Sequence, residues 1–348
     1  MGKAMLIEGK TVVVTGGTGS LGNVLVRRLL SGEVGKAAKV IVFSRDEAKQ
    51  HAMRLDFLRC EQATDEVIYE NFKRTLDFRI GDVRDYHSLL DAFRGANIVV
   101  NAAALKQVPT CEYFPLEASR TNVEGAANVA RAAKASEVDT VVGVSTDKAC
   151  KPVNVMGMTK ALQERIFISA NIGAEKTRFV LVRYGNVLAS RGSVIPLFLS
   201  QIERGLPVTV TTPEMTRFLM SLDQAVDTIF QAIQHAQKGE VVVPPAPSAR
   251  ILDLARCLTH DTKSEIVFTE IRPGEKTHEV LISEEEVPRT SIRDGFYFIR
   301  PLLPELAEPV SLEPCAMDRE YTSRDALLEG EALRALLVEN DFLRPERA

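Results

Sequence analysis

Cysteines are few in this sequence, and they show no pairing pattern. The 348 residues include only Cys60, Cys111, Cys150, Cys257 and Cys315, and no two of them are separated by just two residues. This spacing favours neither a zinc knuckle nor a disulfide framework. We therefore expect no metal site and a reducing, cytoplasmic location.

The sequence also lacks long apolar runs and a strong charge of either sign. No run approaches the ~20 residues of a membrane span, and the opening MGKAMLIEGK has no apolar signal-peptide core. A net charge of −4 argues against nucleic acid or an anionic membrane as the main partner. The composition, 45% hydrophobic residues, is ordinary for a soluble globular protein long enough for two lobes.

Short β-branched runs alternate with helical patterns through the first half of the chain. We expect strands at residues 12–14, 39–46, 77–85, 97–105, 139–146 and 178–187. Such alternation predicts an α/β fold of the Rossmann type, with a doubly wound parallel sheet.

The pattern loosens beyond residue 187, where proline and glycine increase. We expect a nucleotide-binding domain at 1–187, a smaller mixed α/β substrate lobe at 188–285 that can interleave with it, and a C-terminal extension at 286–348. In open α/β folds, ligands bind at the carboxyl ends of the strands, so we expect the lobe to cover those ends.

A glycine-rich stretch, TGGTGSLG at 15–22, lies between the first strand and a helix. Glycines 16, 19 and 22 permit a tight turn, close approach of a pyrophosphate and close helix–strand packing, and the helix N-terminus faces the phosphates. This context predicts a dinucleotide site rather than a bare structural turn. The residues expected there are Thr15, Gly16, Thr18, Gly19, Ser20, Leu21 and Gly22.

The residues after the second strand bear on the choice of cofactor. Ser44 and Arg45 suit the 2′-phosphate of NADP, because a guanidinium matches phosphate geometry. Asp46 suits the ribose hydroxyls of NAD instead. With Lys49 nearby, we expect NADP and keep NAD, or a solvated turn, as alternatives.

Later strand ends complete the expected cofactor site. Asp82 and Val83 can meet the adenine, and the small residues Ala102, Ala103 and Ala104 leave room for the nicotinamide ribose, with Lys106 just beyond. Simple strand–helix packing is the alternative for the three alanines.

The stretch VSTDKACKPVNVMGMTK, residues 144–160, contains the expected chemistry. Its Lys160 follows by four residues a position that usually holds tyrosine, but here the residue is Met156, whose thioether carries no proton. Either the chemistry has been lost or other residues perform it. Asp147 and Lys148 offer a proton donor and acceptor at the end of the fifth strand, unless they form a solvated loop.

Several of these stretches together resemble one family. TGGTGSLG, DVRD, NAAALKQVP, STDKA, MGMTK, VRYGNVLASRGSVIPLF and RPGEKTHEVL are similar to the extended short-chain dehydrogenases. More narrowly, they resemble the UDP-N-acetylglucosamine 4,6-dehydratases of bacterial polysaccharide biosynthesis, over most of residues 10–285. Many members have tyrosine at the position of Met156, and a capsule-sugar subgroup has methionine. Members form dimers to hexamers, so the resemblance implies a homo-oligomer.

The resemblance implies an NADP-dependent 4,6-dehydratase acting on UDP-N-acetylglucosamine, with inversion at C5 as the expected outcome. Hydride leaves C4 of the sugar, water is lost across C5 and C6, and hydride returns to C6. Lys148 is implied as the C5 base, which needs a lowered pKa, and Asp147 as the acid, which needs a raised one. Lys160 is implied to bind the nicotinamide ribose, with Thr146 or Ser145 holding a sugar hydroxyl and Met156 packing against the ligand.

The group that deprotonates the C4 hydroxyl is left open. Three candidates are Lys148 acting twice, a water held by Lys160 and Thr146, and the neighbouring pair Cys111 and Glu112. The residues expected to bind the nucleotide sugar are Lys148, Asn186, Ser190, Arg191, Gly192, Ser193, Arg217, Arg272 and Glu275.

Other functions on the same fold are a nucleotide-sugar C4 epimerase and a 4-keto reductase. An epimerase is expected to keep the tyrosine, and a reductase consumes NADPH stoichiometrically. A non-catalytic NADP(H)-sensing protein is the alternative of another class, which Met156 permits but which has little need of Asp147 and Lys148.

Overall fold

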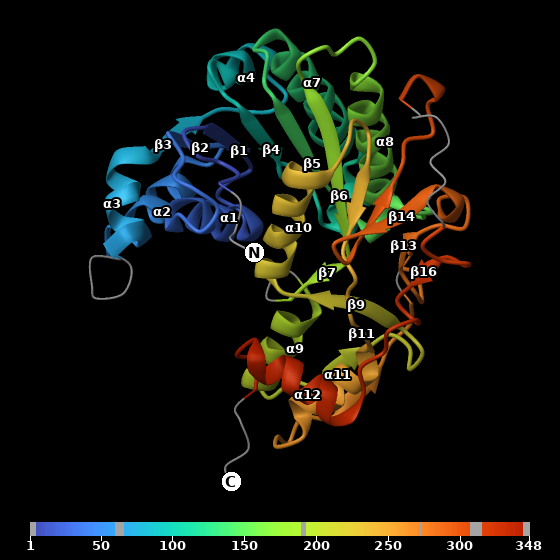
Figure 1. The fold of residues 1–348 in the computed structure, drawn as a ribbon. Helices are drawn as coiled ribbons and strands as arrows, with labels where there is room; N and C mark the ends of the chain where they lie inside the picture. Colours follow the sequence, from blue (N-terminus) through green and yellow to red (C-terminus); the bar gives the residue numbers. More distant parts are fainter. Residues whose placement is uncertain (1–4, 60–65, 189–192, 272, 307–314, 344–348) are drawn as a thin grey trace.

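A computed structural model describes residues 5–59, 66–188, 193–271, 273–306 and 315–343 (Figure 1). Its main feature is a nine-stranded sheet in the order β14-β15-β10-β6-β5-β4-β1-β2-β3, in which the strands from β10 to β3 run parallel. The expected strands form β1 (Thr11–Thr15), β2 (Lys39–Ser44), β3 (Leu76–Ile80), β4 (Ile98–Asn101), β5 (Thr140–Thr146) and β6 (Arg178–Tyr184). The predicted α/β fold with a parallel central sheet is confirmed.

Helices cover both faces of this sheet. One face packs against α1 (Ser20–Ser31) and α10 (Leu222–His235), with α2 (Glu47–Arg59) and α3 (Glu66–Thr75) beyond them. The other face packs against α4 (Tyr86–Phe93), α7 (Gly125–Ala135) and α8 (Val155–Ala170). Successive strand residues point to opposite faces, and both faces are buried in the middle of the sheet, so β1, β2 and β4 contain continuous apolar runs.

The helix expected from residue 116 to 135 is interrupted. It consists of α6 (Pro115–Ser119), a π-helical turn η1 (Arg120–Glu124) and α7. The π turn contains the fully buried Asn122, whose amide bonds Leu105 and Thr159. Such turns are often found near functional sites, and this one joins the loop after β4 to α8.

A second lobe lies beside the carboxyl ends of β5 and β6 (Figure 1). Its small sheets pair β7 (Asn186–Val187), β9 (Thr216–Met220) and β11 (Ser248–Arg250), and β8 (Val208–Val210) with β12 (Ile266–Phe268). Its helices are α9 (Val194–Glu203), α11 (Ile251–Thr259) and α12 (Gly330–Glu339). They share one apolar core.

The three sequence segments interleave more than the sequence indicates. The large sheet takes β10 (Val241–Val243) from the second segment and β14 (Thr290–Arg293) and β15 (Phe296–Ile299) from the third. These strands have only three or four residues each, too short to show a clear period. The division at 187 and 285 stays a prediction about the units, while the sheet itself draws on all three. Within the described residues, no helix combines the length and apolarity needed to cross a membrane.

Candidate active site

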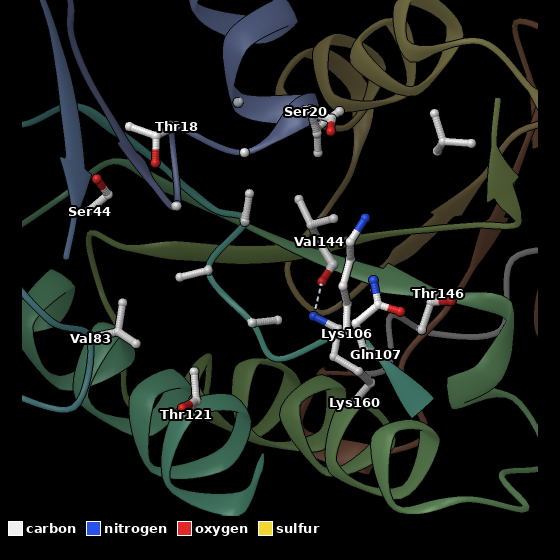
Figure 2. A pocket seen from close by; sticks show the side chains of 18 of the residues that line it. Thr18, Ser20, Ser44, Val83, Lys106, Gln107, Thr121, Val144, Thr146 and Lys160 are labelled. Atoms are coloured by element: carbon white, nitrogen blue, oxygen red, sulfur yellow. Dashed lines mark hydrogen bonds between the residues drawn. The ribbon is translucent and has the colours of Figure 1, made fainter. Parts of the chain in front are cut away.

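A cavity of about 590 Å³ lies along the carboxyl ends of β1, β2, β4, β5 and β6. Figure 2 shows Thr18 and Ser44 toward one end of the view, and Lys106, Thr146 and Lys160 gathered at the other. Most of the residues expected from the sequence line this cavity, and they are Gly16, Thr18, Gly19, Ser20, Leu21, Gly22, Ser44, Arg45, Asp46, Lys49, Asp82, Val83, Ala102, Ala103, Ala104, Lys106, Thr146, Lys148, Met156, Lys160, Asn186 and Ser193.

The glycine loop has the shape that a pyrophosphate needs. Gly16 has a φ of 67°, and a Cβ there would lie 2.8 Å from the backbone nitrogen of Ala103. A Cβ on Gly22 would lie 2.4 Å from the Gly17 carbonyl oxygen. Gly19 caps α1 without a side-chain hydrogen bond, so the first N–H groups of this helix are available to an anion in the cavity. The loop therefore fits a dinucleotide.

Thr15 does not belong to the cavity, contrary to the sequence expectation. Its side chain is fully buried and its Oγ1 donates to Asn101 Oδ1 at 2.6 Å. Because alternate strand residues face opposite ways, Thr15 points across the sheet and ties the end of β1 to β4.

The residues after β2 present positive charge to the adenosine end of the cavity. The half-exposed Arg45 has its Nη1 3.7 Å from Asp82 Oδ2. Asp46 accepts from Lys49, through its backbone N–H at 3.0 Å and its Nζ at 2.8 Å, and these contacts lower the Asp46 pKa. Arg45 and Asp46 are therefore each paired with an opposite charge, and both line the same end of the cavity.

Asp82 and Val83 line the cavity after β3, as expected. Burial alone would raise the Asp82 pKa, but hydrogen bonds from Arg84 and the charge of Arg45 outweigh it and lower the pKa. Asp82 is therefore an ionised acceptor at this end of the site.

Lys160 is held on α8 against the end of β5. Its Nζ donates to the Val144 carbonyl at 2.6 Å (Figure 2). It also donates to Gln163 Oε1 at 2.9 Å. Burial lowers its pKa to about 8, with Glu164 partly opposing the effect. An ammonium has three protons, so one is left for a ligand. With a pKa near 8, Lys160 can also release a proton near neutral pH, a role that the sequence did not suggest.

Lys148 projects into the cavity from the short turn η2 (Asp147–Ala149) that ends β5. Its Nζ lies 2.9 Å from Asp147 Oδ1, 3.3 Å from Asn186 Oδ1 and 3.3 Å from Glu279 Oε1. The two carboxylates raise the Lys148 pKa, outweighing burial, which would lower it. The expected lowering of this pKa is wrong, because two buried acids rather than Lys160 dominate its surroundings.

Asp147 lies behind the cavity wall instead of lining it. Its side chain is fully buried, and its Oδ1 accepts from Lys148 Nζ and, at 2.9 Å, from Thr146 Oγ1. Burial raises its pKa, with Glu279 adding to the effect and Lys148 opposing it. The expected raised pKa is thus present, but the acid is separated from the cavity by the cavity residues Lys148 and Thr146, which bond it, and Gly185.

Met156 fills the position expected of a tyrosine and behaves as a packing residue. It lines the cavity and packs with Cys111 and Ala118. Cys111 is fully buried, which raises its thiol pKa, and Glu112 accepts from the Val155 backbone N–H at 2.7 Å. Neither Cys111 nor Glu112 lines the cavity, so the structure does not support them as the C4 base.

The expected nucleotide-sugar residues are only partly gathered here. Asn186 and Ser193 line the cavity. Arg217 is buried, donates to the carbonyls of Thr216 and Thr277, and does not line the cavity, although its Nε lies 3.8 Å from Glu279, the partner of Lys148. Glu275 does not line it either, although its Oε2 is buried without a hydrogen-bond partner. Ser190, Arg191, Gly192 and Arg272 lie outside the described residues.

Some cavity residues were not anticipated from the sequence. Tyr184 ends β6 beside Asn186, and burial raises its pKa far above the usual value, so it is not a base near neutral pH. Its position at the end of a parallel strand could have indicated that Tyr184 lies at the ligand site. The other unanticipated residues of the cavity are Phe43, Gly81, Gln107, Thr121, Val144, Gly185, Val187 and Leu222, whereas Ser145, expected as an alternative to Thr146, lines it too.

Comparison with known proteins places the chain among polysaccharide biosynthesis proteins. The family described as "Polysaccharide biosynthesis protein" matches residues 12–301. A Rickettsia bellii protein named UDP-glucose 4-epimerase is 42% identical over 347 residues, 97% of this chain and 98% of its own. Pen from Bacillus thuringiensis, a solved structure, is 32% identical with a TM-score of 0.86, covering 97% of this chain and 99% of its own. DesIV, the dTDP-glucose 4,6-dehydratase of Streptomyces venezuelae solved with NAD and TYD, has a TM-score of 0.65 at 22% identity, over 77% of this chain and 86% of its own.

The two predicted reactions are not equally supported by these relatives. The name of the Rickettsia protein favours the epimerase alternative over the dehydratase, and the DesIV likeness, at 22% identity, shows the fold alone. The narrower resemblance to UDP-N-acetylglucosamine 4,6-dehydratases stays a proposal. By the extent of its family match, the chain belongs to the polysaccharide biosynthesis proteins, and its fold is that of the extended short-chain dehydrogenases.

Proposed function

We propose that this protein is an NADP-dependent 4,6-dehydratase of UDP-N-acetylglucosamine that inverts C5. The observation that carries the proposal is an acid and an amine in contact at the cavity, with Asp147 Oδ1 2.9 Å from Lys148 Nζ. Loss of water across C5 and C6 needs one group to take the C5 proton and another to protonate the C6 oxygen. Epimerisation at C4 needs neither transfer, so the pair favours dehydration.

The proposed steps assign the removal of the C5 proton and the protonation of the C6 oxygen to groups of this chain. When bound, NADP supplies reversible hydride transfer at C4 and C6, so no external reductant is consumed. Lys148 Nζ, at the cavity wall, takes the proton from C5. Thr146 Oγ1 lines the cavity and bonds Asp147, so it can pass the acid's proton to the leaving C6 oxygen. When hydride returns to C6, C5 takes a proton from water on the face opposite Lys148, which inverts this centre.

The raised Lys148 pKa is compatible with a basic role because the two groups share a hydrogen bond. Transfer of one proton from the Lys148 ammonium to the Asp147 carboxylate gives a neutral amine and a neutral acid together. A sugar that expels water from the cavity favours this neutral pair, since a low dielectric disfavours charged forms. The pair therefore reaches its reactive state without net loss of a proton to solvent.

The C4 hydroxyl needs a base other than tyrosine. Lys160, with a pKa of about 8, is the group we assign to it, either directly or through a water between Lys160 and Thr146. Lys148 acting twice is less favoured, because its pKa is raised and its Nζ is committed to two carboxylates.

A C4 epimerase is the second candidate function, and the name of the Rickettsia relative favours it. Such an enzyme oxidises C4 and returns hydride to the opposite face of the same carbon. It shares the cofactor cavity and Lys160 but has no use for proton transfer at C5 or C6.

Incubation of the protein with UDP-N-acetylglucosamine, and separately with UDP-glucose, in D₂O tests the proposal. We expect NMR to show a 6-deoxy-4-keto product with deuterium at C5 and no net consumption of NADPH. Inversion at C4 with the C6 hydroxyl retained would establish the epimerase instead, and NADPH consumption would indicate a reductase.

Arg45→Ala is expected to weaken binding of NADP about tenfold or more, because it removes a charge-assisted bond to the 2′-phosphate. Binding of NAD is expected to change less than about threefold, since NAD lacks that phosphate. Titration calorimetry with both cofactors measures the two affinities. An equal loss for both would contradict the assignment of NADP.

Met156→Leu is expected to keep turnover within about threefold of the wild-type value. The two side chains have similar volumes, such apolar exchanges are well tolerated, and we assign Met156 no proton transfer. Initial rates with the sugar nucleotide, together with the melting temperature, check this. Complete loss of turnover in a folded variant would show that the thioether participates.

A further inference from the structure

Glu279 is a buried carboxylate beside the proposed acid–amine pair. It directly precedes β13 (Val280–Ile282), and its side chain is only 3% exposed. Its Oε1 lies 3.3 Å from Lys148 Nζ and 3.8 Å from Arg217 Nε, and its Oε2 lies 3.8 Å from Lys276 Nζ. Three cations therefore surround this one carboxylate.

Asp147 shares Lys148 with Glu279 but has a poorer charge environment. Each carboxyl has one buried oxygen without a hydrogen-bond partner, Asp147 Oδ2 and Glu279 Oε2. Lys276 Nζ lies 3.8 Å from Glu279 Oε2, whereas among the described residues the one cation paired with Asp147 is Lys148, through Oδ1. A buried anionic oxygen without a donor is costly, whereas the same oxygen in a protonated acid is less so. The two carboxyls thus compete for one lysine in unequal surroundings.

When two buried carboxyls lie close together, one of them tends to keep a proton. The proton is expected on the carboxyl with fewer cations around it, which here is Asp147. We propose that Glu279 is a positioning residue of this site, whose carboxylate holds Lys148 Nζ in place and whose negative charge favours the proton on Asp147.

The charges on the neighbouring elements agree with this assignment. Burial alone would raise the Glu279 pKa, but Lys148, Arg217 and Lys276 outweigh it and lower the pKa. Burial raises the Asp147 pKa, and the Glu279 charge raises it further. His278 bonds Thr216, and burial and nearby arginines lower its pKa, so it adds no charge near pH 7.

This role of Glu279, which rests on the proposed dehydratase function, affects how the reaction rate depends on pH. Asp147 is an acid below its pKa and stops donating as the pH rises through it. Glu279 raises the pKa values of both Asp147 and Lys148. Removing the Glu279 charge therefore lowers both values, and the whole pH–rate profile moves toward lower pH.

Glu279→Gln is the test, because the amide keeps the shape and removes the charge. We expect the alkaline limb of kcat/KM for product formation to move down by about one pH unit or more. Glu279→Asp keeps the charge on a shorter chain and should shift the limb less, in the same direction. Glu320→Gln, which removes a carboxylate paired with Lys151 away from the cavity, should leave it in place.

A second measurement separates this inference from the proposed function. The protein is labelled with ¹³C at the aspartate side-chain carboxyl carbon, Asp147→Asn identifies the Asp147 signal, and its titration is followed in wild type and in Glu279→Gln. A lower Asp147 pKa in the variant supports the inference even if no sugar nucleotide is dehydrated. An unchanged Asp147 pKa, or Glu279→Gln and Glu320→Gln profiles that coincide, overturns it.

Discussion

Asp147→Asn is expected to slow loss of the C6 hydroxyl by about 10²–10⁴-fold, the usual contribution of a general acid. The amide keeps the shape of the buried side chain and can still accept from Thr146, but it cannot supply a proton. Oxidation at C4 needs no proton from Asp147, so transient reduction of the nicotinamide should remain.

Two readouts are needed for this variant. Stopped-flow absorbance of the reduced nicotinamide reports oxidation at C4, and NMR of the sugar reports water loss. Asp139→Asn, which changes an exposed aspartate just before the amino end of the same strand β5, is the matched control and should stay within about twofold of wild type. Equal activity of Asp147→Asn and wild type would remove Asp147 from the chemistry and leave the epimerase as the better function.

Replacing Lys148 is expected to abolish incorporation of solvent deuterium at C5. Lys148→Met removes the amine, and Lys148→Arg keeps a cation between Asp147 and Glu279 but stays protonated, because an arginine does not lose its proton in proteins. Both should lower C5 exchange and turnover by about 10²-fold or more.

The arginine variant separates catalysis from folding. It can keep the ion pairs of Lys148 with Asp147 and Glu279, so its melting temperature should stay closer to wild type than that of Lys148→Met, which leaves two buried acids without their cation. NMR of the sugar recovered from D₂O measures the exchange. Deuterium at C5 at the wild-type rate in Lys148→Arg would show that another group is the base.

The parts of the site that were predicted correctly depend on local sequence patterns. Sequence analysis predicted the glycine loop, the six strands and the position of Lys160. Each of these depends mainly on residues close together in the sequence. The carboxyl ends of parallel strands meet at one edge of a sheet, so the alternating pattern alone predicts that the loops after β1, β2, β4 and β5 lie together.

Residues at strand ends were less certain in detail. Thr15 and Arg217 were expected to contact the ligand but do not line the cavity, because the side of the sheet on which a residue projects depends on register and on what packs there. The role of Asn122 could not be predicted from the sequence. Its side chain bonds Leu105 and Thr159, which lie in different segments of the chain.

By itself, then, the sequence determined the fold class, the dinucleotide loop and the replacement of tyrosine by Met156, all of which follow from local periodicity and side-chain chemistry. Only the tertiary structure decided the protonation of the site. Glu279 comes from a distant segment to lie beside Lys148, and it raises the Lys148 pKa that the sequence led us to expect lowered. Charge interactions depend on distance in space and on burial, and neither can be obtained from spacing along the chain.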